Sequence, residues 1–141
     1  MKTIIFDLDG TLVRLQPQLV LIADVYQLTS LRKSYAFALV SGGKKREVLD
    51  ALDKTGLRFL FEDALIVTFE DTNQEKASGE PFREIQQRLQ GNMVMIGDSE
   101  SDALGTKVAE LSFVKVPTYQ DLQEQRKALA AAIGQALHLL K

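Results

Sequence analysis

Five short apolar runs recur along the chain, each rich in Ile, Val, Phe or Leu. They span Thr3–Phe6, Ala36–Val40, Ala64–Val67, Met93–Ile96 and Ser112–Val116. Neighbouring positions within a run are mostly apolar rather than alternating with polar ones, and this pattern predicts strands that are buried on both faces. A sheet made of such strands must be covered on both sides by other elements.

Segments with helical spacing of apolar residues lie between these runs. We expect helices over roughly Gln18–Ser30, Lys44–Lys54, Glu80–Gln90, Ser101–Ala109 and Asp121–Leu140. In the last segment, apolar residues recur at intervals of three and four, as on the buried face of a helix that packs on a sheet. The polar stretch 70–81, with the sequence EDTNQEKASGEP, is the longest expected loop.

The alternation of strands and helices predicts an α/β fold. Parallel strands need crossover connections, and helices in those crossovers cover both faces of the sheet. We therefore expect one domain over residues 1–141, with a three-layer, Rossmann-like fold around a five-stranded parallel sheet. In such folds, ligands bind beyond the carboxyl ends of the strands. The residues that directly follow each strand are therefore candidates for a functional site.

Composition and charge narrow the range of functions. The 141 residues carry a formal net charge of −2 and include no cysteine. Nucleic-acid binding is not indicated, because basic residues are not in excess. The lack of cysteine excludes disulfides, thiolate nucleophiles and cysteine-ligated metals. The apolar runs are shorter than the ~20 residues of a membrane span, and residues 1–10 do not resemble a signal peptide. We expect a cytoplasmic protein that does not contact a membrane.

Charged and hydroxyl side chains follow four of the predicted strands. They are Asp7 and Asp9 after the first strand, Ser41 after the second, Lys76 in the loop after the third, and Asp98 and Asp102 after the fourth. Because the carboxyl ends of parallel strands lie at one edge of the sheet, all six can converge there. The carboxylates offer the hard oxygen ligands that suit Mg²⁺, and the lysine and hydroxyl suit phosphate oxygens. The sequence thus predicts magnesium-dependent chemistry on a phosphate group.

The segments that hold these residues resemble the four ordered motifs of the haloacid dehalogenase-like hydrolase superfamily. They are the strand followed by DLDGT at 7–11, ALVSGG with Ser41, EKASGEPF with Lys76, and MIGDSESD with the later acid pair. The resemblance runs from Lys2 to about Val116 and implies the HAD-like form of the predicted fold. It also implies a hydrolase that acts on phosphate monoesters with Mg²⁺ as cofactor.

The resemblance implies a role for each matching residue. Asp7 would attack phosphorus and form an aspartyl-phosphate, and Asp9 would protonate the leaving oxygen and later activate water. Gly10 permits the tight backbone path after the acids. The residues implied in phosphate binding are Gly10, Ser41, Gly42 and Lys76. Those implied in metal binding are Asp7, Asp9 through its backbone carbonyl, Asp98, and Asp102, which would act through water or by orienting Lys76.

The third motif departs from the family pattern. The usual Lys-Pro-x-Pro-x-x-Phe appears as KASGEPF at 76–82, which keeps the lysine and phenylalanine positions but displaces or loses both prolines. Lys76 is therefore the expected phosphate-binding lysine, with Lys44 and Lys45 as alternatives. For Ser41, the alternative role is that of a helix N-cap, which does not exclude phosphate binding.

The spacing of the motifs leaves no room for a cap domain. Members of the resembling superfamily often carry such a domain between the first and second or the second and third motifs. Here 34 positions separate Asp7 from Ser41, and 35 separate Ser41 from Lys76. The open site would serve a phosphorylated macromolecule that covers it, a small phosphate ester, or a homo-oligomer in which a neighbouring subunit covers it.

Three alternatives to a phosphatase stay open at this point. A phosphotransferase of the same family would use the same residues but needs water to be excluded. A receiver-type signalling domain also has an acidic Mg²⁺ pocket, but its phosphorylated aspartate follows the third strand. An impaired protein could bind metal and phosphate without turnover, and the altered third motif is the feature that favours it.

Overall fold

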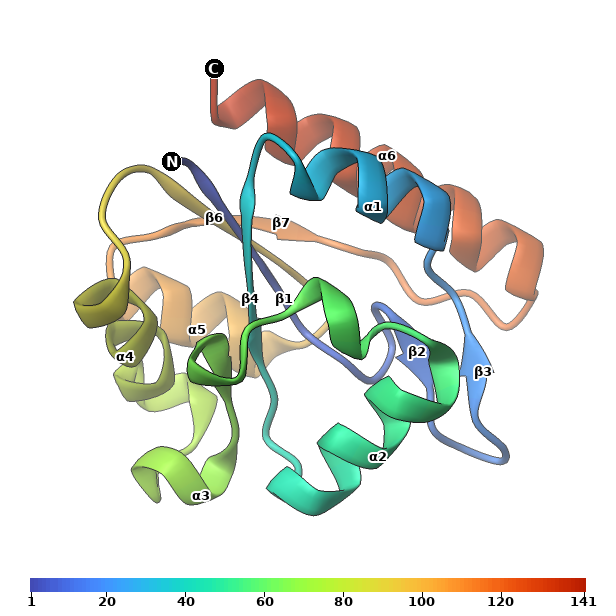
Figure 1. The fold of residues 1–141 in the computed structure, drawn as a ribbon, viewed down its shortest axis with the longest axis horizontal. Coiled ribbons are helices and arrows are strands. Elements are labelled where there is room, and N and C mark those ends of the chain that lie inside the picture. The colour runs from blue at the N-terminus through green and yellow to red at the C-terminus, as the bar shows by residue number, and fades with distance from the viewer.

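The computed structural model describes all 141 residues (Figure 1). The strands are β1 (Thr3–Phe6), β2 (Val13–Arg14), β3 (Val20–Leu21), β4 (Ala36–Val40), β5 (Ile66–Val67), β6 (Met93–Gly97) and β7 (Ser112–Lys115). The α-helices are α1 (Val25–Arg32), α2 (Lys45–Thr55), α3 (Phe69–Thr72), α4 (Glu80–Arg88), α5 (Glu100–Val108) and α6 (Leu122–Leu139). Three short 3-10 helices span Arg58–Leu60, Asp63–Leu65 and Lys76–Ser78.

Five strands form one parallel sheet in the order β5-β4-β1-β6-β7, with β1 at its centre. The hydrogen-bond ladder continues one residue past two of the strands. The N–H of Asp7 donates to the Ile96 carbonyl at 3.0 Å, and the N–H of Ser41 donates to the Val67 carbonyl at 2.9 Å. The sheet therefore fixes the backbone of both residues, and the predicted α/β fold is confirmed.

Helices cover both faces of this sheet (Figure 1). The larger core cluster has 26 buried residues and includes side chains of α1, α2 and α6. The smaller cluster has 10 buried residues and includes side chains of α4. Side chains of β1 alternate between them, since Ile4 and Phe6 belong to the first cluster and Ile5 to the second. Burial on both faces explains why the strand is apolar at each position after Thr3.

One predicted helix is wrong in its first half. The segment Gln18–Ser30 does not form a single helix, because Val20–Leu21 pairs with Val13–Arg14 as an antiparallel hairpin. Two further N–H groups, of Ile22 and Ala23, donate to the Leu12 carbonyl. Helix α1 begins only after Asp24, whose carboxylate accepts the N–H of Tyr26 at 3.0 Å and caps the helix. The local cap and the β-branched residues before it account for the hairpin.

Two further expectations need correction. The third strand begins at Ile66 rather than Ala64, because Asp63–Leu65 forms a 3-10 turn. Strand β7 lies at the sheet edge and is not buried on both faces, since Ser112 and Lys115 are exposed.

The polar stretch 70–81 is not an open loop. It contains most of α3, which Asp71 stabilises by accepting the N–H of Thr68 at 2.7 Å, and the 3-10 helix Lys76–Ser78. The intervals between the motifs hold the hairpin, helices and strands of the core fold and no inserted cap domain, as expected. None of the helices combines the length and apolar character needed to cross a membrane.

Candidate active site

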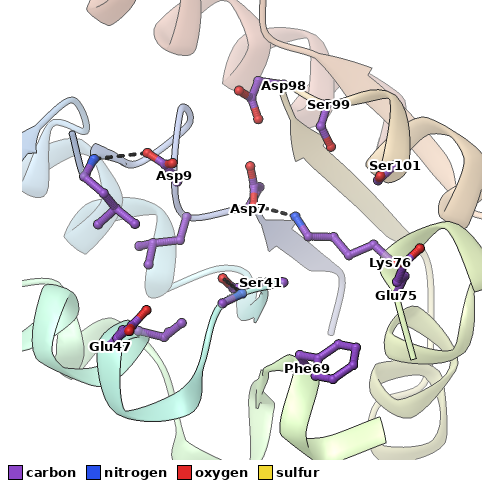
Figure 2. Close-up of a pocket in the computed structure, with 15 residues that line it drawn as sticks. Asp7, Asp9, Ser41, Glu47, Phe69, Glu75, Lys76, Asp98, Ser99 and Ser101 are labelled. Atoms are coloured by element: carbon purple, nitrogen blue, oxygen red, sulfur yellow. Dashed lines mark hydrogen bonds and ion pairs between the residues drawn. The ribbon is translucent and has the colours of Figure 1, made fainter. Parts of the chain in front are cut away.

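Asp7, Lys76 and Asp102 meet at the carboxyl edge of the sheet. Figure 2 shows the contact between Asp7 and Lys76. The Nζ atom of Lys76 lies 2.6 Å from Oδ1 of Asp7 and 2.9 Å from Oδ1 of Asp102. All three side chains are largely withdrawn from solvent, with exposures of 11% for Lys76, 7% for Asp7 and 0% for Asp102. One buried ammonium thus bridges two buried carboxylates that are 95 positions apart in the chain.

Close packing against α5 places Lys76 in this position. A Cβ atom at Gly105 would lie 1.9 Å from the Lys76 carbonyl oxygen, so only glycine allows the 3-10 helix Lys76–Ser78 to approach α5. The alternative lysines do not reach the site. Lys45 pairs with Asp71 at 3.1 Å on the surface, and Lys44 is exposed before α2. The structure therefore brings Lys76, and neither alternative, beside Asp7.

Asp102 also has a local structural role. It is the third residue of α5, and its Oδ2 accepts the Ser99 hydroxyl at 2.9 Å, while the Ser99 Oγ accepts the Asp102 N–H at 3.1 Å. This reciprocal capping box fixes the start of α5. Its other oxygen, Oδ1, is left to accept from Lys76. The Asp102 carboxylate therefore both caps the first turn of α5 and orients the Lys76 ammonium.

Asp98 lies against the turn that follows Asp7. A Cβ atom at Gly10 would lie 2.1 Å from Oδ2 of Asp98, and Gly10 has a φ of +83°. Both observations require glycine at this position. Oxygen atoms of Asp7, Asp98 and Asp102 lie within 4.8 Å of one another. Three carboxylates grouped in this way fit the hard-oxygen ligand set of Mg²⁺.

Asp9 lines the cleft from a turn rather than from a strand. It does not continue an extended strand, in which its side chain would share a face with that of Asp7, because β1 ends at Phe6. Residues 8–13 form a tight turn, and Asp9 lies on its exposed side. Its Oδ1 accepts the N–H of Leu15 at 3.0 Å. The Asp9 carboxylate lines the same cleft as Asp7 but stands apart from the three grouped carboxylates.

Ser41 lies at the end of β4 and lines the cleft together with Gly42 and Gly43. Its Oγ accepts the N–H of Gly43 at 3.2 Å, which holds the turn after the strand. Ser41 is not a helix cap, because α2 begins after Lys44. Its hydroxyl hydrogen can therefore be donated to a ligand in the cleft. A Cβ atom at Gly42 would lie 3.8 Å from Cε of Lys76, which places the two predicted phosphate-binding segments side by side.

Burial and charge shift the pKa values of three groups. Burial raises the pKa of Asp7 to about 7, with Lys76 opposing the rise and Asp98 adding to it. Burial also raises the pKa of Asp102, and the charge of Asp7 contributes. Burial alone would lower the pKa of Lys76, but the carboxylates of Asp7 and Asp102 outweigh it and raise that pKa. The site therefore holds more negative charge than one ammonium balances, and a cation would relieve the excess.

Asp7, Lys76 and Asp98 line an open cleft with a volume of about 730 Å³, whereas Asp102 is buried behind it. The walls of the cleft include Leu15, Glu47, Phe69 and Glu75, none of which the sequence analysis singled out. Figure 2 shows Phe69 and Glu47 on the side of Ser41, and Glu75 beside the stem of Lys76. Phe69 and Glu75 both follow the third strand, and this position after a strand end is the sequence signal that could have identified them as cleft residues. Leu15 reaches the cleft because it belongs to the β2–β3 hairpin, and the pattern of apolar residues did not predict this hairpin.

A family model described as haloacid dehalogenase-like hydrolase matches residues 18–110. The chain belongs to this family. The matched segment contains Ser41, Lys76 and the two later acids, whereas Asp7 and Asp9 precede it. Membership excludes the receiver-type alternative, and it assigns the chain to a family of hydrolases. No protein among the curated sequences matches this chain.

Several solved structures share the fold of this hydrolase. A protein from Thermotoga maritima assigned as a β-phosphoglucomutase has a TM-score of 0.76 and 16% identity, over 95% of this chain and 99% of that one. A protein from Lactobacillus plantarum assigned as a phosphoglycolate phosphatase has a TM-score of 0.63 and 14% identity, over 89% and 98%. A Bacillus subtilis HAD-hydrolase bound to magnesium has a TM-score of 0.59 and 24% identity, over 79% and 56%.

Proposed function

We propose that this protein is a Mg²⁺-dependent phosphatase that hydrolyses phosphate monoesters through an aspartyl-phosphate on Asp7. We further propose that residues 1–141 form a single catalytic domain. The observation that carries the proposal is the position of Asp7 directly after the central strand, where its carboxylate contacts the Lys76 ammonium at 2.6 Å and is grouped with the carboxylates of Asp98 and Asp102. Family membership and fold neighbours assigned as phosphatases support the same chemistry.

In the first step, a carboxylate oxygen of Asp7 attacks phosphorus. A bond forms between that oxygen and phosphorus, and the bond from phosphorus to the leaving oxygen breaks. Asp9 lines the cleft on an exposed turn and donates a proton to the leaving oxygen. Lys76 already lies 2.6 Å from Asp7, so its charge is in place for the phosphate oxygens.

In the second step, water attacks the phosphorus of the aspartyl-phosphate. Asp9, now ionised, takes a proton from this water, the bond between Asp7 and phosphorus breaks, and inorganic phosphate leaves. Ser41 donates its hydroxyl hydrogen to a phosphate oxygen throughout. The open cleft admits the water that this step needs, which favours hydrolysis over transfer to a second substrate.

The three grouped carboxylates of Asp7, Asp98 and Asp102, with the backbone carbonyl of Asp9, would hold the Mg²⁺ ion. When bound, the ion supplies positive charge that screens the phosphate from Asp7 and favours the ionised form of that carboxylate. Asp102 also holds Lys76 at 2.9 Å, so its role is shared between the metal site and the lysine. The magnesium-bound structure of a fold neighbour is in keeping with this assignment.

The test is release of inorganic phosphate from p-nitrophenyl phosphate and a panel of phosphate esters, with Mg²⁺ and with EDTA. We expect wild-type activity to need Mg²⁺, Asp7→Asn to lose it, and Asp98→Ala to need far more Mg²⁺. Full activity of Asp7→Asn would contradict the nucleophile assignment. Phosphate that appears on an added alcohol instead of in solution would indicate a phosphotransferase.

Absence of turnover on every ester would leave the impaired binding protein as the remaining alternative. Beryllium fluoride separates that case from a demanding substrate, because it binds as an aspartyl-phosphate mimic only where Asp7 can accept phosphorus. We expect wild type to bind it with Mg²⁺ and Asp7→Asn not to. A homo-oligomer that covers the site would be found by light scattering in the same samples.

A further inference from the structure

Two arginines tie the β2–β3 hairpin to the C-terminal part of the chain. Arg14 in β2 donates through Nη1 to the Gln120 carbonyl at 2.9 Å and through Nη2 to the Tyr119 carbonyl. Arg126 in α6 donates in the opposite direction, to the Leu21 carbonyl in β3 at 2.9 Å. Figure 1 shows the hairpin beside the loop that leads from β7 into α6. Both strands of the hairpin are therefore held from the same side.

The loop that receives Arg14 is itself anchored. Gln125 in α6 is 1% exposed, and its Oε1 accepts the Tyr119 N–H at 2.6 Å while its Nε2 donates to the Pro117 carbonyl at 3.0 Å. A buried side-chain amide with both ends bonded is costly to displace. Helix α6 is in turn fixed to the sheet by buried side chains such as Leu129 and Ile133. Arg14 thus bonds to a rigid support.

The hairpin carries the contact that orients Asp9. Leu15 directly follows Arg14, and its N–H gives the Asp9 carboxylate the one side-chain hydrogen bond that Asp9 makes in the structure. Leu15 lines the cleft, whereas Arg14 does not. Arg14, which bonds to the loop before α6, is therefore only one peptide bond away from the Leu15 N–H that orients the Asp9 carboxylate.

We propose that Arg14 is a positioning residue that orients the Asp9 carboxylate by clamping the hairpin to the loop before α6. This rests on the proposed acid–base role of Asp9. Arg14 and the loop at 117–121 lie outside the matched segment 18–110. Without the clamp, the Leu15 N–H no longer holds a fixed position, and the carboxylate samples orientations away from the leaving oxygen.

The experiment compares two substrates that differ in their need for a proton. Phenyl phosphate has a basic leaving group that needs Asp9, whereas p-nitrophenyl phosphate has one that leaves readily. For Arg14→Ala we expect kcat/KM to fall by about 10- to 100-fold on phenyl phosphate and by less than about 3-fold on p-nitrophenyl phosphate. Arg14→Lys keeps the charge but not the bidentate donor, so its loss on phenyl phosphate should lie between those of wild type and Arg14→Ala.

Arg32→Ala is the matched control. Arg32 also donates to two backbone carbonyls, those of Leu60 and Tyr35, but it lies at the end of α1 away from the cleft. Loss of these bonds should lower thermal stability without changing the ratio of the two substrates. Arg14→Lys replaces Arg14→Ala in the comparison if the alanine variant does not fold.

Asp9→Asn separates this proposal from the proposed function. If Asp9→Asn lowers phenyl phosphate turnover selectively and both Arg14 variants do not, the clamp is refuted while the acid–base role stands. If Asp9→Asn has no selective effect, the acid–base role fails. Hydrogen exchange of the Leu15 amide then tests the clamp without activity: Arg14→Ala should speed exchange at least about 10-fold relative to Arg32→Ala. Equal rates would overturn the clamp.

Discussion

Two parts of the site are built in different ways, although Asp7 and Asp9 are only two residues apart. Asp7 is buried, its backbone N–H is bonded to the sheet, and its carboxylate contacts Lys76 at 2.6 Å. Asp9 is exposed on a turn, and one N–H of a surface hairpin orients its carboxylate. We refer to the first as the inner site and to the second as the rim.

The difference matches the chemistry proposed for each part. A nucleophile and its counter-charge must keep one geometry through both steps, and the sheet supplies that rigidity. An acid–base group must exchange its proton with solvent between steps, so exposure suits it. We expect inner-site changes to remove activity outright, and rim changes to alter its dependence on substrate.

After the complete loss expected for Asp7→Asn, the largest effect on activity is expected from Lys76. Replacement by Met keeps most of the side-chain volume but leaves the carboxylates of Asp7 and Asp102 without their shared ammonium. We expect kcat/KM for p-nitrophenyl phosphate to fall by about 1,000-fold, in the range seen when a charge-stabilising donor is removed. The matched control is Lys45→Met, because Lys45 makes a surface ion pair with Asp71. A comparable loss in Lys45→Met would show that the wrong lysine has been assigned.

A smaller loss is expected from Gly10→Ala, which acts where the turn meets the inner site. The added Cβ would lie 2.1 Å from Oδ2 of Asp98 at a φ of +83°, so the turn or the carboxylate must move. We expect about 100-fold lower activity at low Mg²⁺, partly restored at high Mg²⁺, because the proposed metal ligand Asp98 is displaced rather than removed. Gly134→Ala in α6 is the control, since its Cβ would meet nothing within 4 Å.

The inner site could be predicted from the sequence because it depends on strand ends. A run of apolar residues followed by acids places Asp7 and Asp98 at one sheet edge whatever the details of the loops. Lys76 was assigned by motif despite the missing prolines, and the structure explains its position through the contact between Gly105 and the Lys76 carbonyl. No local pattern encodes that contact, since it joins residues 29 positions apart.

The rim could not be predicted, because its parts depend on long-range hydrogen bonds. The hairpin has only two residues in each strand, too few for an alternating pattern, and its apolar residues were taken for the start of a helix. The support for the hairpin comes from Arg14 and Gln125, which bond to carbonyls and an N–H of a loop. Side-chain bonds to the backbone leave no periodic signal in a sequence.

A third prediction concerns the stability of the inner site without metal. At about pH 8 the Asp7 carboxylate is ionised in both states, although burial raises its folded pKa to about 7. Asp7→Asn removes this unfavourable charge, and Lys76 keeps Asp102 as a partner. We expect the variant to be more stable than wild type by about 2 kcal/mol in EDTA, measured by urea unfolding.

The difference in stability between wild type and Asp7→Asn should depend on pH, and the raised pKa of Asp7 sets its sign. Between the unfolded pKa of 3.8 and the folded pKa of about 7, the unfolded protein has lost the Asp7 proton that the folded protein retains. Wild-type stability relative to Asp7→Asn should therefore fall as the pH rises through this range and level off above it. A wild type that is more stable than the variant at about pH 8 in EDTA would contradict the charge excess inferred for the inner site.

The smallest effect is expected from Glu75, an exposed glutamate that lines the cleft without an ion pair and belongs to neither part. Phosphoethanolamine and phosphoglycolate place opposite charges on the leaving group, and the acidic cleft should favour the first. We expect Glu75→Gln to lower the ratio of their kcat/KM values by about 2- to 3-fold, because a solvated charge several ångströms away contributes under 1 kcal/mol. Glu110→Gln, before β7 and outside the cleft, should leave the ratio unchanged. A change of about 100-fold at Glu75 would mean that an exposed residue of the cleft contributes as much as the buried inner site, and the contrast between buried and exposed parts of the site would fail.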